Sequence, residues 1–297
     1  MLICLFILAT CFQIHQFQQL EDNSQSPLVH IGLDYVADSE FKYDDTEKWK
    51  EKYPICGGKS QSPINIDPSK CERVSKKATL KVTNEDYRPE SVELINDHYT
   101  VKYLISWQKN HFPTISGDIL RHNRYIPRDI HFHWGHEDSQ GSEHSINTRK
   151  YSMEMHIVSY NAKYKSVADA KFHRDGILVI AQLFHVNNSA PNYFFLDYLP
   201  RVKQSRRKIV IKDKLCAFNL GEFLNVDALS ASFVTYNGSF TTPPCYEDVT
   251  WVLPLKINAI PHNKMRFFRD IQGLEGHLVD NYRPIQPTNG RKCYALG

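Results

Sequence analysis

The chain has 297 residues, of which 41% are hydrophobic and 12% aromatic, with only 13 glycines and 15 prolines. This composition excludes disordered, collagen-like and low-complexity proteins, and the formal charge of +3 is too small to indicate a nucleic-acid or acidic-membrane partner. The 14 histidines and 7 cysteines are the unusual features, because these side chains bind metals and form disulfides.

The N-terminus begins with the apolar run MLICLFILATCF, which has the length of a signal-peptide core and is too short to span a bilayer. The sequence therefore predicts a secretory signal over residues 1–19, followed by an acidic lead-in over residues 20–40. A buried N-terminal helix or strand is the alternative. No other stretch approaches 18 apolar residues, so we expect a secreted protein without a stable membrane anchor.

Most of the remaining chain consists of short runs that alternate apolar and polar residues between Asn, Asp, Gly or Pro, which is typical of β-strands. Strands are predicted over residues 78–83, 91–95, 99–104, 130–134, 151–160 and 176–186. Helices are predicted only over residues 190–202 and 263–274. No repeat or linker divides the chain, so we expect one mainly β domain over residues 41–292 and a short tail, residues 293–297.

Residues 201–214 are rich in Lys and Arg, but aliphatic rather than aromatic residues lie between them. This pattern favours a solvated amphipathic edge over a nucleic-acid site.

Two predicted strands carry histidines at spacings that suit a metal. In the run Ile-His-Phe-His-Trp, His131 and His133 project from the same face of a strand, because residues i and i+2 share a face. An antiparallel return through Met-Glu-Met-His would bring His156 across from them. Three neutral imidazoles suit zinc and leave a fourth position for water. A surface or satisfied polar role remains the alternative for the His-x-His pair taken alone.

Cys4 and Cys11 leave with the predicted signal, so five cysteines remain and at least one stays free or pairs between chains. Two sequons, at Asn187 and Asn237, are candidates for N-glycosylation, and Asn187 lies in the better surface-loop context.

Beside the histidines stand four further motifs: Gln61-Ser-Pro-Ile-Asn-Ile, Gly141-Ser-Glu-His, Ser239-Phe-Thr-Thr-Pro-Pro and Asn281-Tyr-Arg-Pro-x-Gln-Pro. Together and in this order they resemble the α-class carbonic anhydrases from about residue 41 to residue 291. The resemblance implies a single domain around a mainly antiparallel sheet of about ten strands, with zinc at the bottom of a conical cleft. It also implies reversible hydration of carbon dioxide to bicarbonate and a proton by a zinc-bound hydroxide, the lyase activity of a carbonate dehydratase.

The resemblance assigns roles residue by residue. The zinc ligands would be His131, His133 and His156, with Glu154 holding the imidazole of a zinc ligand from outside the coordination sphere. Thr241 would accept a hydrogen bond from the zinc-bound hydroxide and donate its own proton to Glu143. Thr242 would bind bicarbonate or anions. The apolar pocket for carbon dioxide would be formed by Val158, Val179, Phe240 and Trp251.

The sequence departs from the family pattern at the proton relay. Aligned without gaps, Tyr99 occupies the shuttle position and His98 stands one place earlier, so His98 could act only through a bulge or an unusual side-chain path. Tyrosine, with a pKa near 10, is a poor relay at neutral pH. Asp129 replaces a glutamine that commonly contacts the first zinc ligand, and Phe240 replaces a leucine. The resemblance places Tyr43 and Tyr236 in the hydroxyl and water network.

Cys56 and Cys245 match the disulfide of secreted and membrane-bound family members, whereas Cys71, Cys216 and Cys293 have no assigned counterpart. The alternative function is a catalytically weak, carbonic anhydrase-like extracellular binding protein. Its usual mark, loss of a zinc histidine, is absent. A zinc peptidase is disfavoured because the sequence has no His-Glu-x-x-His motif. The sequence leaves the oligomeric state open.

Overall fold

The computed structural model describes residues 41–75, 79–212 and 218–296. The predicted signal, the acidic lead-in and Cys216 lie outside these ranges. The described residues all belong to one compact unit.

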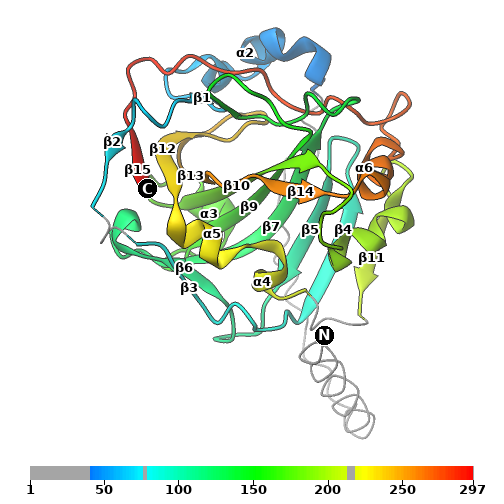
Figure 1. Ribbon diagram of the computed structural model, residues 1–297, viewed down its shortest axis with the longest axis horizontal. Helices are drawn as coiled ribbons and strands as arrows, with labels where there is room; N and C mark the ends of the chain where they lie inside the picture. Colours follow the sequence, from blue (N-terminus) through cyan, green and yellow to red (C-terminus); the bar gives the residue numbers. More distant parts are fainter. Residues whose placement is uncertain (1–40, 76–78, 213–217, 297) are drawn as a thin grey trace, which may run out of the picture. The chain divides into compact units, whose positions relative to one another are not determined.

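Thirteen strands of the described chain form one sheet, and ten of them follow each other in a continuous path (Figure 1). In spatial order the path is β11 (Lys208–Ile211), β4 (Ser91–Asn96), β5 (Val101–Ser106), β7 (Tyr125–Trp134), β9 (Met153–Asn161), β10 (Ile177–Val186), β13 (Glu247–Pro254), β12 (Phe233–Ser239), β15 (Cys293–Leu296) and β2 (Glu72–Arg73). Three strands lie off this path: β3 (Lys81–Thr83), β6 (Thr114–Ser116) and β14 (Asn258–Ile260). A separate parallel pair joins β1 (Asn65–Ile66) to β8 (Ser145–Ile146).

Most neighbouring strands are antiparallel, while β10 runs parallel to β13 and β14, and β15 runs parallel to β2. The predicted fold class is therefore confirmed, with a sheet that is mixed at one side. Residues 293–296, which we expected to form a tail, instead form β15 between β12 and β2. The Cys71–Cys293 disulfide joins the start of this strand to the residue before β2.

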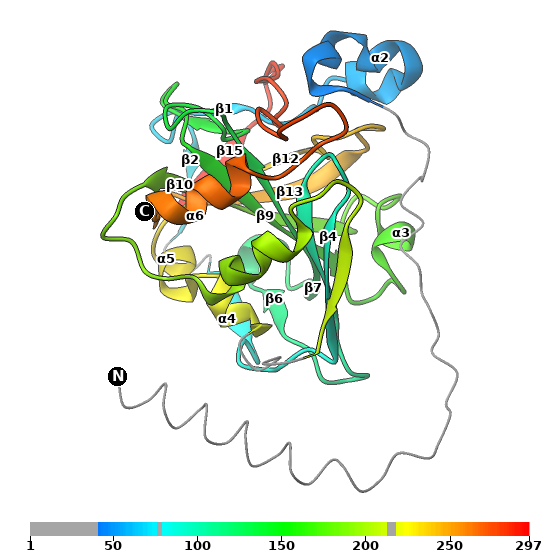
Figure 2. The same ribbon diagram turned by 90° about the vertical axis from the view of Figure 1, so that its right-hand side faces the viewer.

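The two faces of the sheet have different partners. On one face, Phe132, Trp134 and Met155 belong to the main hydrophobic core. Figure 2 shows α4 (Leu220–Phe223), α5 (Val226–Ala231) and α6 (His262–Arg269) on that side, and α3 (Val167–Ala170) on the other. The opposite face carries the histidines of β7 and β9 and a second apolar cluster that includes Val158 and Trp251. Alternation along each strand thus separates the packing face from the face that bears polar groups.

The other helical segments are short: η2 (Tyr43–Lys48), α2 (Trp49–Lys52), η3 (Pro54–Gly57), η4 (Asp118–Leu120) and η5 (Phe194–Val202). The helix predicted over 190–202 is thus the 3-10 helix η5, and it begins only at Phe194. Pro200 inside it lacks the N–H that an α-helix needs. The helix predicted over 263–274 is α6 and ends at Arg269, before a reversal in which Gly273 N–H donates to the Gly276 carbonyl at 2.7 Å.

The strand predicted from residue 99 begins only at Val101, because residues 97–100 form the turn between β4 and β5. Asp97 Oδ1 accepts hydrogen bonds from the backbone N–H groups of Tyr99 (3.1 Å) and Thr100 (2.9 Å). His98 has a left-handed backbone with φ of 65°. This side-chain-capped turn replaces the strand pairing that alternation alone had predicted.

Among the described residues, none of the helices has the length and apolar composition that crossing a bilayer requires.

Candidate metal centre

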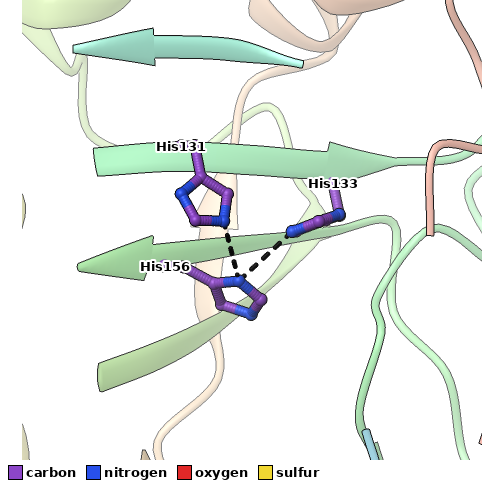
Figure 3. Close-up of side chains that lie close together, drawn as sticks. All are labelled: His131, His133 and His156. Carbon is purple, nitrogen blue, oxygen red and sulfur yellow. Dashed lines mark hydrogen bonds between the residues drawn. The ribbon is translucent and has the colours of Figure 1, made fainter. Parts of the chain in front are cut away.

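Adjacent strands bring three histidines together at the centre of the sheet (Figure 3). His131 and His133 lie two residues apart on β7, and His156 on the antiparallel β9 is directly opposite His131. The predicted antiparallel return is therefore present. His156 Nδ1 lies 3.2 Å from His131 Nε2 and 3.2 Å from His133 Nε2. These three nitrogens form one of two groups of potential metal-ligating atoms in the described chain.

Each of these rings uses its other nitrogen to donate a hydrogen bond. His131 Nδ1 donates to a carboxylate, His133 Nδ1 to a backbone carbonyl, and His156 Nε2 to a second carboxylate. The acceptors are Asp129 Oδ1 at 2.6 Å, the Asn281 carbonyl at 2.7 Å and Glu154 Oε1 at 2.6 Å, respectively. Because a neutral imidazole has one N–H, the three nitrogens that face one another carry lone pairs.

The three lone pairs converge, with His156 Nδ1 at 3.2 Å from each of the other two nitrogens, and they repel one another unless a cation lies between them. Tetrahedral zinc with bonds of 2.0 to 2.1 Å to nitrogen would separate its ligand atoms by about 3.3 Å. The observed spacing and the outward hydrogen bonds therefore fit Zn²⁺, and acceptors that hold the distal nitrogens are the usual surroundings of zinc-bound histidines.

Burial favours the neutral, metal-binding form of two of these histidines, His133 and His156. The pKa of His133 lies well below its ordinary value because burial and the neighbouring His156 both disfavour a positive charge. Burial also lowers the pKa of His156 to about 4, although Glu154 acts in the opposite direction. Burial alone would raise the pKa of Asp129, but the His131 ring and the Lys102 ammonium hold it below its ordinary value.

A second group consists of His144, Glu154 and His156. Glu154 Oε1 accepts hydrogen bonds from His144 Nδ1 and His156 Nε2, both at 2.6 Å, and Oε2 accepts one from the His144 backbone N–H at 2.7 Å. Burial would raise the pKa of Glu154, but the two histidines hold it well below its usual range. These atoms are joined by hydrogen bonds, so the group supports the first site and is not a second metal site.

The network continues from His144 to groups on other segments. His144 Nε2 accepts a hydrogen bond from the Tyr236 hydroxyl at 2.7 Å, and that hydroxyl lies 2.8 Å from Ser62 Oγ. The sequence had placed Tyr236 in such a network through the resemblance, but it had assigned no role to His144 or Ser62. Their location in the Gly-Ser-Glu-His and Gln-Ser-Pro motifs was the only available signal.

Glu143 lies beside the three histidines, with Oε2 at 3.5 Å from His133 Nε2. Its Oε1 accepts a hydrogen bond from the backbone N–H of Arg283 at 2.8 Å. Burial and the charge of Glu154 raise the pKa of Glu143 to about 8, while the Arg283 N–H and the Thr241 hydroxyl act in the opposite direction. The Thr241 hydroxyl is therefore close enough to Glu143 to influence the pKa of its carboxyl group, as expected for the predicted pair.

The predicted pocket residues lie on the same face as the histidines. Val158, Val179 and Trp251 occupy successive positions across β9, β10 and β13, and all three are buried in the second apolar cluster. The Trp251 ring lies 4.9 Å from the His156 ring in a T-shaped contact, so apolar surface adjoins the metal-ligating group. Phe240 packs against this cluster. Thr242 follows in the same loop and is half-buried.

A disulfide and a buried arginine hold the loop that contains Thr241. Cys245 in this loop is joined to Cys56, the pair that the resemblance had suggested. The Arg283 guanidinium donates to the Cys56 carbonyl at 2.9 Å, to the Ser62 carbonyl at 2.9 Å and to a side-chain oxygen of Gln61 at 2.8 Å. One residue, Arg283, therefore links this disulfide to Glu143, a role that the sequence had not predicted.

The two candidates for the proton shuttle, Tyr99 and His98, lie near Tyr43 in an aromatic cluster around Phe41. The Tyr99 ring stacks on Phe41 at 4.1 Å, and its hydroxyl accepts a hydrogen bond from the Phe41 N–H at 3.3 Å. The Tyr43 ring contacts Phe41 and Trp49 in the aromatic cluster beside Cys56. The structure thus places Tyr43 and Tyr99 in contact with a common ring, with His98 next to them in the turn.

Comparisons with known proteins agree with this geometry. A family model described as eukaryotic-type carbonic anhydrase matches residues 44–296. The chain is also 33% identical over 284 residues to carbonic anhydrase 15 of Mus musculus, in an alignment that covers 90% of this chain and 86% of that protein. Both comparisons extend across nearly the whole described fold.

Proposed function

The chain belongs to the eukaryotic-type carbonic anhydrases, and we propose that it catalyses reversible hydration of carbon dioxide to bicarbonate and a proton. Zinc would be held by His131, His133 and His156. The observation that supports this most directly is the convergence of three unprotonated imidazole nitrogens, each with its opposite nitrogen donating to an acceptor.

Bound zinc would lower the pKa of a water molecule to about 7, the value that holds for this enzyme family, and so supply a nucleophile near neutral pH. Glu143 would be ionised beside a dication at His133, because an opposite charge within a few ångströms favours the carboxylate. The Thr241 hydroxyl could then donate to Glu143 and keep a lone pair for the attacking water. This orients the nucleophile without a proton transfer to the protein.

The apolar residues beside His156 suit the substrate. Carbon dioxide carries no net charge or dipole, so the buried surface of Val158, Val179 and Trp251 can accept it without loss of hydrogen bonds. Phe240 would form the wall of this pocket, and Thr242 would contact the anionic product. The polar and apolar halves of the site thus match the product and the substrate, respectively.

We infer that release of the proton to solvent is slower than hydration of carbon dioxide and limits turnover. Tyr99 occupies the family's shuttle position, and a phenol with an ordinary pKa near 10 transfers protons poorly at neutral pH. His98 lies in the same turn with a left-handed backbone, which changes the direction of its side chain relative to a strand residue. We expect moderate turnover that imidazole-like buffers increase. If His98→Ala lowers turnover about tenfold and imidazole restores it, His98 is the shuttle.

Two disulfides support an oxidising compartment, because such bonds are rare in the cytosol. We propose secretion directed by a signal over residues 1–19, a catalytic domain that begins near residue 41, and N-glycosylation at Asn187. Asn187 is exposed and its side chain caps a turn at Ser189. Mass spectrometry of the protein secreted by eukaryotic cells would test the signal cleavage and the glycosylation, and limited proteolysis would test where the domain begins.

The decisive experiment combines zinc analysis with stopped-flow hydration of carbon dioxide, before and after treatment with a chelator. His156→Ala should lose both zinc and activity, whereas His122→Ala, at a largely exposed histidine, should keep both. Stoichiometric zinc without chelator-sensitive hydration would refute the enzyme and favour a carbonic anhydrase-like binding protein.

A further inference from the structure

Strand β11 and the turn before it concentrate positive charge at one edge of the sheet (Figure 1). Residues 201–212 contain six Lys and Arg and no Asp or Glu, whereas the whole chain has a formal charge of +3. The rest of the chain therefore has a net charge of −3. All six side chains are exposed, and we call them the basic edge: Arg201, Lys203, Arg206, Arg207, Lys208 and Lys212.

Four of these six side chains have no acidic partner among the described residues. Lys208 pairs with Glu93 at 2.7 Å and Lys203 with Asp270 at 3.7 Å. Arg201 lies over the Tyr198 ring at 4.7 Å. For the remaining three basic residues, the described residues provide no ion pair. Within the part of the chain that the structure describes, Arg206, Arg207 and Lys212 are thus exposed cations without an acidic partner.

The basic edge is extended and does not form a compact patch. Within the described sheet β11 pairs only with β4, so its other edge has no strand partner. Lys208 and Lys212 are four residues apart on the strand and its continuation, which corresponds to about 14 Å. Arg206 forms the tip of the preceding turn with φ of 59°, a conformation that Gly or Asn adopts more easily than arginine. A line of cations fits a linear polyanion.

The surroundings distinguish among polyanions. The basic edge has one exposed aliphatic side chain, Val210, which is 47% exposed, and this offers little apolar surface for insertion into a membrane. Tyr198, the ring that Arg201 covers, is buried, and the described residues 201–212 contain no aromatic side chain on which nucleic-acid bases could stack. Arginine guanidinium groups bind sulfate and carboxylate oxygens in bidentate geometry.

From these observations we propose that the basic edge binds a linear sulfated polysaccharide outside the cell. The proposal rests on the extracellular location proposed above, and it is independent of the catalytic function. Bound there, the enzyme would be retained at a sulfated surface while the metal-ligating face of the central strands remains separate from β11.

The test is calorimetric titration of the full-length secreted protein with a heparin oligosaccharide in about 0.15 M NaCl, where exposed charges are largely screened beyond about 8 Å. The triple variant Arg206→Gln, Arg207→Gln, Lys212→Gln should bind at least about tenfold more weakly, since each screened contact contributes a factor of a few. A matched control, Lys50→Gln, Lys59→Gln, Lys256→Gln, removes the same charge from exposed lysines elsewhere and should bind like the wild type.

Desulfated heparin and vesicles containing anionic lipid complete the experiment. Loss of binding on desulfation would support the proposal. It would be overturned if both triple variants weakened binding equally, if heparin did not bind, or if only anionic vesicles bound. Hydration of carbon dioxide, measured on the same samples, should be unchanged in both variants, so failure here is distinguishable from failure of the proposed function.

Discussion

Replacement of Glu154 by glutamine tests the network that orients the metal-ligating histidines. The two oxygens of Glu154 accept three hydrogen bonds, from His144 Nδ1, His156 Nε2 and the His144 backbone N–H. Glutamine has one acceptor oxygen, so at least one of these buried donors would face an N–H group. If His156 responds by moving its proton to Nδ1, it loses the lone pair that faces His131 and His133.

The number of hydrogen bonds that Glu154 accepts gives the expected loss of zinc affinity. Removal of such a supporting acceptor weakens zinc binding by about 10- to 100-fold, which corresponds to about 1.4 to 2.8 kcal/mol. The matched variant is Asp129→Asn. Asp129 Oδ1 accepts one hydrogen bond, from His131 Nδ1, and asparagine retains an oxygen for it. We therefore expect Asp129→Asn to change zinc affinity by less than about threefold.

The assay is competition for zinc against a chelator of known affinity, with circular dichroism to verify that each variant is folded. Equal losses of zinc affinity in Glu154→Gln and Asp129→Asn would refute the idea that the number of accepted hydrogen bonds determines the effect. Unchanged affinity in folded Glu154→Gln would show that Glu154 does not orient the zinc ligands.

Three further predictions concern the neighbouring groups. Thr241→Val should lower kcat/KM for carbon dioxide about 100-fold at unchanged zinc content, because the orienting hydroxyl is lost, and parallel loss of zinc would contradict this role. Removal of the Cys56–Cys245 bridge should reduce the free energy of unfolding in urea by about 2 to 4 kcal/mol; an unchanged value would show that the bridge does not stabilise the fold. In the zinc-free protein the pKa of Glu143 rises from 4.5 to about 8 on folding, so its contribution to stability is present below about pH 4.5 and is lost as the pH rises toward 8. Glu143→Gln should therefore stabilise the zinc-free protein near pH 8, by at most about 1.4 kcal/mol for each pH unit above 4.5, and have little effect near pH 4; equal effects at both pH values would count against the raised pKa.

The shuttle region shows where local pattern was insufficient. Alternation predicted a strand from residue 99, and the structure has a turn there because Asp97 caps the N–H groups of Tyr99 and Thr100. Side-chain capping competes with strand pairing at every Asp or Asn, and hydrophobic periodicity does not report which one wins. Helix α6 also ends earlier than its pattern predicted, at Arg269.

The pattern of residues along the chain was enough to predict the mainly β fold and the two strands that carry His131, His133 and His156. This was accessible because side chains alternate across a strand, so a metal-ligating pair two residues apart is a local property. The motifs in order also indicated the family, and through it the Cys56–Cys245 pairing.

The groups that hold these side chains in place come from distant parts of the chain and could not be predicted from local pattern. The acceptor of His133 is the carbonyl of Asn281, 148 residues away, and the N–H that binds Glu143 belongs to Arg283, 140 residues away. The pairing of Cys71 with Cys293 spans 222 residues. Every residue has a backbone carbonyl and every residue except proline has a backbone N–H, so their use as partners leaves no mark in the sequence and depends on where the folded chain places them.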